Sequence, residues 1–252
     1  MILGIHHGGR TVVDLDAALA HLRTLSDWET VHLLPPDHPL IAGLGVQRGA
    51  LLEGPNAFIE LLEVAAPVST RRTVAQPGIS HLSIQLPDMT TKNAILARLG
   101  VERHAEPIEL GTGFSYLYVR DLEHNVTEIE GAAHAPGRLT AWFSHAGMAT
   151  SDIATLRDIY EGLLGSPAVA TARFSANPAL DSVTALNEVD VTMSWVPSAN
   201  ARVELIQFHH PATGPPEHRP VSVPGVGHLA LEVDDLAADL AAAVAVGLTP
   251  LH

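Results

Sequence analysis

The stretch Gly78-Ile79-Ser80-His81-Leu82-Ser83-Ile84-Gln85-Leu86-Pro87-Asp88 has the pattern of a short strand that carries one histidine and ends at a residue able to cap a helix. This arrangement occurs four times, and in each copy an aspartate follows a histidine by seven residues. The four pairs are His7 and Asp14, His81 and Asp88, His145 and Asp152, and His228 and Asp235. A recurrence at a period of roughly 65 to 80 residues indicates a repeated supersecondary unit.

The composition is that of a globular protein that acts on small molecules or binds other protein chains. Of 252 residues, 46% are hydrophobic and 17% charged, which is typical of one large or two modest packed domains. The formal net charge of -14 argues against nucleic-acid and membrane surfaces as partners, and it favours a small-molecule substrate. A homo-oligomer is compatible with this composition. The sequence has neither a long apolar run nor a basic and then apolar leader, and it has no cysteine, so we expect a cytoplasmic protein.

Each histidine-to-aspartate opening is followed by a helix, and the complete units continue with three strands. The predicted helices lie at about 15–25, 88–99, 152–164 and 236–246. The predicted strands of the first two units lie at about 2–13, 30–34, 43–52, 57–64, 79–86, 102–109, 114–120 and 125–130. The third unit has a longer middle and a closing strand near 201–208. The fold class is therefore α+β, built from tandem β-α-β-β-β modules.

Two segments have the composition of linkers, namely 131–138 and the proline-rich 211–224. The first of these predicts an N-terminal domain at 1–131, containing modules one and two. The C-terminal domain would then span 142–252, with module three and a partial module four.

A second polar residue recurs in the closing strands. Glu60, Glu128 and Glu204 each lie in a short apolar β segment, 47 to 59 residues after the histidine of the same unit. Because a buried, unpaired carboxylate is costly, each of them either faces water or has a cationic partner, and a metal ion is one such partner. A single histidine or glutamate in a strand is ordinarily structural, but their joint recurrence favours a ligand role. Without cysteine, any bound metal must be held by nitrogen and oxygen.

These features make the chain similar to the vicinal oxygen chelate superfamily, which includes glyoxalase I, methylmalonyl-CoA epimerase, extradiol dioxygenases and bleomycin resistance proteins. The resemblance is carried by the four openings, by the closing strands 58–64 and 203–208, by the run from Tyr118 to Glu128, and by the helix end Tyr160-Glu161-Gly162-Leu163-Leu164-Gly165. It implies that two modules pair into an incomplete barrel. The metal would lie in its cleft, with one ligand from the first and one from the last strand of each module.

Carried onto this chain, the resemblance implies two ligand sets. The N-terminal pair of modules offers His7, Glu60, His81 and Glu128. The C-terminal pair offers His145, Glu204 and His228. The divalent ion itself is left open among Zn, Ni, Co, Mn and Fe, all of which suit two imidazoles and two carboxylates.

The first functional hypothesis is a glyoxalase-like or epimerase-like enzyme, a lyase or isomerase that transfers a proton on a metal-chelated carbonyl or vicinal-oxygen substrate. In such relatives a metal-bound glutamate also serves as the base, and this implies Glu60 or Glu128. The leading alternative is an Fe(II) extradiol dioxygenase, in which His145 and His228 would share one ion with a carboxylate. The second alternative is a non-catalytic binding protein of the antibiotic-resistance type.

The chain departs from its relatives in two places. Where they commonly have Asp-Pro-Asp-Gly-Asn, this chain has Asp121-Leu122-Glu123-His124-Asn125, which puts the turn geometry in question. The fourth unit also stops at His252, before its closing strands. We therefore expect the natural polypeptide to continue for roughly 30 to 45 residues and to supply a further glutamate.

Overall fold

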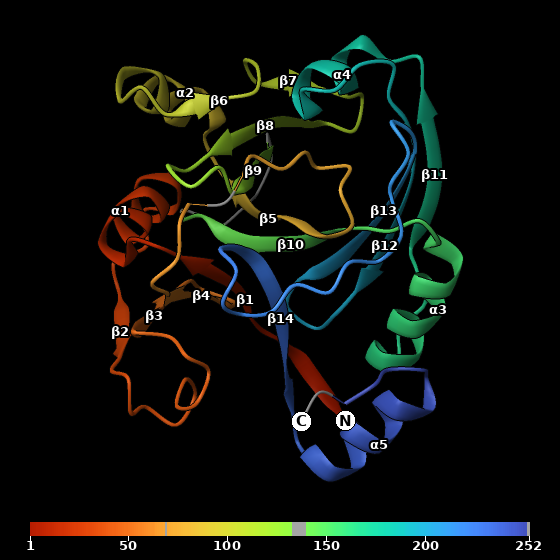
Figure 1. Ribbon diagram of the computed structural model, residues 1–252. Helices are drawn as coiled ribbons and strands as arrows, with labels where there is room; N and C mark the ends of the chain where they lie inside the picture. The colour runs from red at the N-terminus through yellow and green to blue at the C-terminus, as the bar shows by residue number, and fades with distance from the viewer. Residues whose placement is uncertain (69, 133–139, 251–252) are drawn as a thin grey trace.

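The computed structural model describes residues 1–68, 70–132 and 140–250, and all four units are present in it (Figure 1). Unit one contains β1 (Ile2–Val12), α1 (Leu15–Ser26), β2 (Val31–Leu34), β3 (Arg48–Glu53) and β4 (Phe58–Glu63). Unit two contains β5 (Gly78–Leu86), α2 (Met89–Arg98), β6 (Glu102–Arg103), β7 (Ile108–Glu109), β8 (Phe114–Arg120) and β9 (Val126–Ala132). Unit three contains β10 (Trp142–Ala149), α3 (Ile153–Leu164), β11 (Ala170–Ser175), α4 (Pro178–Thr184), β12 (Asp190–Pro197) and β13 (Arg202–His210). Unit four contains β14 (Gly225–Val233) and α5 (Leu236–Ala245).

The recurring aspartates begin the helices, as the sequence predicted. Asp14, Asp88, Asp152 and Asp235 are the N-cap residues of α1, α2, α3 and α5. Each side chain accepts a hydrogen bond from the backbone N–H three residues further on, which satisfies one of the free donors of the first turn. The α+β class and the repeated module are confirmed.

Within the part of the chain that the structure describes, the strands form two open sheets, and these join the units in an unexpected way. A five-stranded sheet has the order β14-β1-β4-β3-β2. A nine-stranded sheet follows the path β11-β12-β13-β10-β5-β9-β8-β6, with β7 beside β8. Unit one therefore pairs with unit four, and unit two pairs with unit three.

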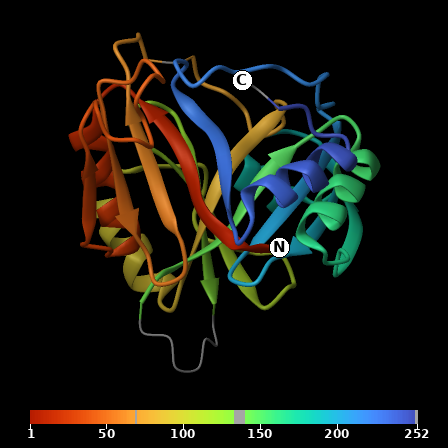
Figure 2. The same cartoon turned by 90° about the horizontal axis from the view of Figure 1, so that it is seen from below.

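The predicted pairing of unit one with unit two, and of three with four, is thus wrong for the sheets. Antiparallel pairs of opening strands make the two joints: β5 with β10, and β1 with β14, which lie side by side in Figure 2. Most of the predicted linker at 131–138 lies within residues 133–139, which are outside the described residues. The domain boundaries drawn from this linker therefore stay a prediction.

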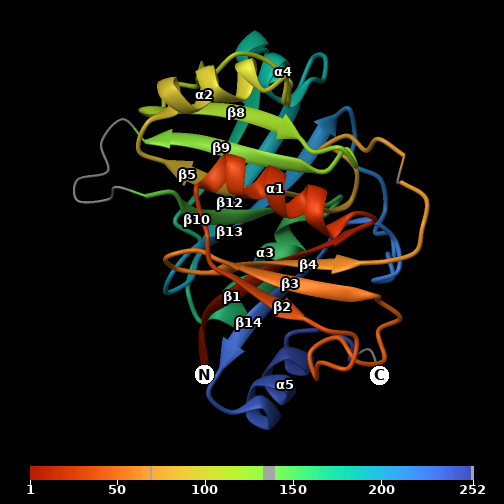
Figure 3. The same cartoon turned by 90° about the vertical axis from the view of Figure 1, so that its left-hand side faces the viewer.

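Helix α1 packs across the junction of the two sheets. It contacts β3 and β4 on one side and β5 and α2 on the other (Figure 3). The buried side of this helix is an apolar stripe, with Leu15, Leu22 and Leu25 in one core that continues into both sheets. Within the described residues, no helix combines the length and apolar character that crossing a bilayer requires.

Two asparagines tie the five-stranded sheet to unit three. The Asn200 side chain accepts from the N–H of Ile5 (2.9 Å) and donates to the carbonyls of Ile5 and Asn56 (2.7 and 2.6 Å). The Asn56 side chain in turn accepts from the N–H of Phe143 (2.9 Å) and donates to the carbonyls of Phe143 and Asn200 (2.8 Å each). These bonds satisfy main-chain groups where β1 meets the strands of unit three.

The unusual turn at 121–125 forms without the glycine of its relatives. Asp121 accepts from the N–H groups of Glu123 and Asn125 (2.9 Å each), and its other oxygen accepts from buried Arg10 (3.1 Å). His124, in the position of the glycine, has φ 66° and adopts the left-handed conformation itself. The carboxylate of Asp121 holds the turn closed despite that conformation.

Candidate metal centre

Four of the predicted ligands converge between units two and three. They are His81 on β5, Glu128 on β9, His145 on β10 and Glu204 on β13. We call them the four-residue cluster. One donor atom from each lies within 4.8 Å of the others, and the four side chains are no more than 5% exposed.

Strand register explains why these side chains meet. In the antiparallel pair β5 and β10, His81 lies opposite Gly147 and His145 lies opposite Ser83, so each histidine faces the residue two positions after the other. Because side chains alternate along a strand, both imidazoles project from the same face of the sheet. The parallel neighbours β9 and β13 then place Glu128 beside Ser83 and Glu204 beside Gly147.

The distances within the four-residue cluster are those of ligands around one ion. His81 Nε2 lies 3.2 Å from His145 Nε2, 3.1 Å from Glu128 Oε2 and 3.4 Å from Glu204 Oε2. His145 Nε2 lies 3.6 Å from the Glu128 oxygen and 3.4 Å from the Glu204 oxygen. Ligands about 2.1 Å from a shared ion are separated by about 3.0–3.4 Å in octahedral or tetrahedral geometry. The donor set therefore fits a divalent metal.

Glu204 is oriented by an aromatic donor on the neighbouring strand. Trp195 Nε1 donates to Glu204 Oε1 at 2.8 Å. At the equivalent position of unit two, Tyr118 lies opposite Glu128. The other oxygen, Glu204 Oε2, is buried and accepts no hydrogen bond from the described residues, yet it points at both imidazoles. An oxygen aimed in this way is what a metal ligand requires.

Serines that precede the two histidines fix the imidazole tautomers. Ser80 Oγ lies 3.0 Å from His81 Nδ1 and donates to the carbonyl of Gly147. Ser144 Oγ lies 3.3 Å from His145 Nδ1 and donates to Glu130 at 2.5 Å. Since both hydroxyl protons are used elsewhere, both oxygens accept from Nδ1–H, and the Nε2 lone pairs stay directed into the cluster.

The charges of the four-residue cluster are strongly coupled. Burial lowers the pKa of His81 and His145, but Glu128 and Glu204 outweigh it and raise both values. Burial likewise raises the pKa of Glu204, yet His145 and His81 outweigh it and lower the pKa to about 2. Without a metal, the cluster is thus held together by imidazolium and carboxylate charges. A divalent ion would take the place of those protons.

The remaining three predicted ligands form a second group between units one and four. His7, Glu60 and His228, the three-residue cluster, also have donor atoms within 4.8 Å of one another. Nε2 of His7 and of His228 are 3.1 Å apart and lie 3.7 and 3.0 Å from Glu60 Oε2. The His228 side chain is 37% exposed. The residue opposite Glu60 on the neighbouring strand is Leu51. At the equivalent position beside Glu204, the four-residue cluster has an aromatic donor instead.

The predicted residues therefore converge, but in different sets. Units one, two and three each contribute a histidine and a glutamate to one cleft, and unit four contributes its histidine. However, His7 and Glu60 do not join His81 and Glu128, because their units lie in different sheets. His145 and His228 are also separated, so the ion-sharing pair assumed for the dioxygenase alternative is not formed.

Glycines provide the space for two of the imidazoles, a role that the sequence reasoning missed. A Cβ added to Gly147 would lie 2.1 Å from Cε1 of His81, and one added to Gly9 would lie 1.9 Å from Cε1 of His228. Both glycines follow a cluster histidine by two residues, in His145-Ala146-Gly147 and in His7-Gly8-Gly9. That shared spacing was the available signal.

A cavity of about 250 Å³ opens onto the four-residue cluster. Glu128 and Glu204 form part of its wall, and Arg202 and Glu130 lie beside them. Most of the remaining wall is apolar or aromatic and includes Phe114, Tyr116, Phe174, Leu180, Met193 and Trp195. Several of these side chains come from β11, α4 and β12, the part of unit three for which the sequence predicted only a longer middle.

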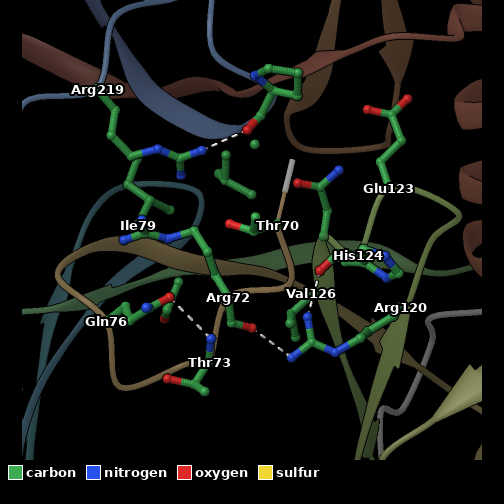
Figure 4. Close-up of a pocket in the computed structure, with 15 residues that line it drawn as sticks. Thr70, Arg72, Thr73, Gln76, Ile79, Arg120, Glu123, His124, Val126 and Arg219 are labelled. Atoms are coloured by element: carbon green, nitrogen blue, oxygen red, sulfur yellow. Dashed lines mark hydrogen bonds between the residues drawn. The ribbon is translucent and has the colours of Figure 1, made fainter. Parts of the chain in front are cut away.

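A separate polar pocket lies where the chain enters β5 and β14, and Figure 4 shows its arginines. Arg72 donates to the carbonyl of Pro77 at 3.1 Å, and Arg219 donates to that of Pro224 at 2.6 Å. Arg120 donates to the carbonyls of His124 and Arg72. Pro77 and Pro224 immediately precede the strands that carry His81 and His228, so these contacts help to position the ligand strands.

Comparison with known proteins relates the C-terminal part of the chain to one superfamily and the fold of the whole chain to two solved structures. Residues 144–252 match the family model described as the Glyoxalase/Bleomycin resistance protein/Dioxygenase superfamily. A mutant form of glyoxalase I from Zea mays superposes with a TM-score of 0.71 at 16% identity, covering 96% of this chain and 80% of that one. A putative dioxygenase from Bacillus subtilis gives 0.66 at 15% identity, with 95% and 73% covered. At these identities the likeness shows the fold alone. No curated protein sequence gave a significant match.

Proposed function

We propose that this chain is a metal-dependent enzyme of the glyoxalase type, within the glyoxalase/bleomycin resistance protein/dioxygenase superfamily (the vicinal oxygen chelate group) whose family model matches residues 144–252. Its active site would be the four-residue cluster. The observation that carries the proposal is the position of this cluster, in which two imidazoles and two carboxylates converge, fully buried, at the wall of an apolar cavity. The three-residue cluster would be a weaker second metal site, because it has fewer ligands and a more exposed histidine.

The donor set supports a divalent ion and a neutral site. His81 and His145 would bind through Nε2, and Glu128 and Glu204 would bind through the oxygens that already face these nitrogens. When bound, such an ion supplies a Lewis acid for negative charge that develops on two vicinal oxygens of a substrate. Ser80, Ser144 and Trp195 would keep the ligands in place.

The carboxylates that line the cavity would move the proton. Glu128 or Glu204 would remove a proton from a carbon next to the substrate carbonyl and return it to the same or a neighbouring atom, as in an isomerase or lyase. Glu60, proposed as an alternative base from the sequence, lies in the other cluster and does not line this cavity. The apolar wall would exclude water from the carbanion-like transition state.

The test is solvent exchange in D₂O on protein dialysed against a divalent metal. We expect the wild-type protein to exchange the α-protons of simple α-hydroxy ketones such as hydroxyacetone, as followed by NMR. We expect Glu128→Gln and Glu204→Gln to lower the rate by about 10²–10⁴-fold. Oxygen uptake with catechol, in the absence of such exchange, would instead support the dioxygenase. Ligand binding without metal and without turnover would support a resistance-type binding protein.

A further inference from the structure

The cavity contains a cation one layer beyond the four-residue cluster. Arg202 precedes Glu204 by two residues on β13, and Glu130 follows Glu128 by two on β9. Side chains two residues apart share a face of a strand and are separated by about 6.7 Å. Arg202 and Glu130 therefore form a second polar layer along the same cavity wall.

The charge of Arg202 is only partly offset within this layer. Its Nη2 donates to Ser144 Oγ at 2.9 Å and lies 3.5 Å from Glu130 Oε2. That glutamate oxygen already accepts from Gln85 Nε2 at 2.9 Å and from Ser144 Oγ at 2.5 Å. Among the described residues, the hydrogen bonds of Arg202 come from Nη2, so Nε and Nη1 keep free donors on a side chain that is 39% exposed.

We propose that Arg202 is a specificity-determining residue that binds a carboxylate of the substrate, so that the substrate is a small acid with an apolar body. This inference rests on the proposed function, because the other end of the substrate would have to present two vicinal oxygens to the four-residue cluster. The apolar wall between the two layers, including Phe114, Phe174 and Met193, would contact the connecting carbons. The spacing of the layers fits a carboxylate about four to five bonds from the reacting oxygens.

The planar guanidinium suits this role in a protein of net charge -14. A free anion is repelled by the overall charge, so selective uptake of an acid needs a local cation inside the cavity. Arginine supplies parallel N–H donors that match the two oxygens of a carboxylate. A neutral analogue would leave these donors without a partner.

The experiment compares two probes on protein loaded with redox-inactive Zn²⁺. One is glutaric monohydroxamate, whose hydroxamate offers two vicinal oxygens and whose far end is a carboxylate. The other is its carboxamide, which has the same shape without the charge. Calorimetric titration measures both probes on the wild type and on Arg202→Gln, Arg202→Lys and the control Arg173→Gln. Arg173 pairs with Asp190 on the exposed edge formed by β11.

We expect the wild type and Arg173→Gln to prefer the carboxylate probe by roughly tenfold. The preference should disappear in Arg202→Gln and be partly retained in Arg202→Lys, while the carboxamide binds all four proteins alike. Equal affinity for both probes in the wild type, or a preference that survives Arg202→Gln, would overturn the role of Arg202. If neither hydroxamate binds, or if binding survives His145→Ala, the proposed metal site is itself wrong and both ideas fall. Thermal melting of each variant separates misfolding from lost binding.

Discussion

The Nε2 atoms of His81 and His145 lie 3.2 Å apart, although 64 residues separate these histidines in the chain. They occupy neighbouring antiparallel strands from two different units, and each carries a hydrogen-bonded serine on Nδ1. Two imidazoles that face each other through their Nε2 atoms, with two carboxylates alongside, are the donor set that a divalent metal ion would need.

The first prediction concerns metal stoichiometry. His81→Ala and His145→Ala should each remove the same tightly bound ion, so the double variant should lose no more metal than either single one. His7→Ala should leave that ion in place, because His7 belongs to the three-residue cluster. Metal analysis after dialysis provides the measurement. Additive losses from the two single variants would show that the histidines hold different ions.

The glycines opposite the histidines give a second prediction. Gly147→Ala should displace the His81 ring and greatly weaken metal binding at the four-residue cluster, without changing any ligand. Gly9→Ala should affect only the three-residue cluster, through His228. Gly227→Ala is the matched control, since an added Cβ there meets nothing within 4 Å. Metal titration distinguishes these outcomes, and equal affinities across the three variants would contradict the close approach.

Trp195 should tune the metal site through its single N–H. Trp195→Phe removes the donor to Glu204 Oε1 and keeps most of the packing, so metal affinity should fall about 10–100-fold. Trp28→Phe removes a comparable buried N–H that donates to the carbonyl of Ala141 at 2.8 Å. That control should lower thermal stability while leaving metal affinity unchanged. A metal affinity unaffected by Trp195→Phe would argue against the orienting role.

Acid should destabilise the protein partly through His104. Burial and then Arg120 lower the pKa of His104 from 6.5 to about 4. Its Nε2 accepts from Arg120 Nε at 2.9 Å, so the folded state holds the neutral ring. As the pH falls, the ring takes up a proton in the unfolded chain before it does so in the folded protein. The contribution of His104 to the free energy of unfolding, which is fully present above pH 6.5, is therefore lost as the pH falls towards 4.

The variant His104→Gln isolates this contribution. Urea unfolding at pH 7, 5.5 and 4.5 should show the wild type losing about 1–2 kcal/mol more than the variant, a value reduced for partial exposure of the ring. Parallel loss of stability in the two proteins would show that His104 titrates normally.

The asparagine bridge should matter for stability rather than for metal binding. Asn200→Ala leaves the N–H and carbonyl of Ile5 without their partner and should cost on the order of 2–3 kcal/mol. The exposed Asn187 provides the control, and Asn187→Ala should change stability little. Denaturant unfolding compares the two variants. A small effect of Asn200→Ala would mean that water replaces the bridge.

Local sequence determined the repeated module and the candidate ligands that it carries. The capping aspartates and the helices and strands that follow them depend on neighbouring residues, and they formed where the pattern placed them. The recurrence of a histidine in all four units and of a glutamate in the first three likewise identified the residues that converge in the clefts. The same reasoning failed for β11 and α4, whose polar and irregular sequence has little periodicity.

Tertiary structure alone decided which modules share a cleft. The opening strands of all four units are alike, so nothing local distinguishes β5 pairing with β10 from β5 pairing with β1. That choice depends on contacts far apart in sequence, such as Asn200 with Ile5 and the ring of His81 against Gly147. For the same reason, the cavity, Trp195 and Arg202 became visible only in the folded chain, because a cavity wall is assembled from several strands whose neighbours are set by the sheet as a whole.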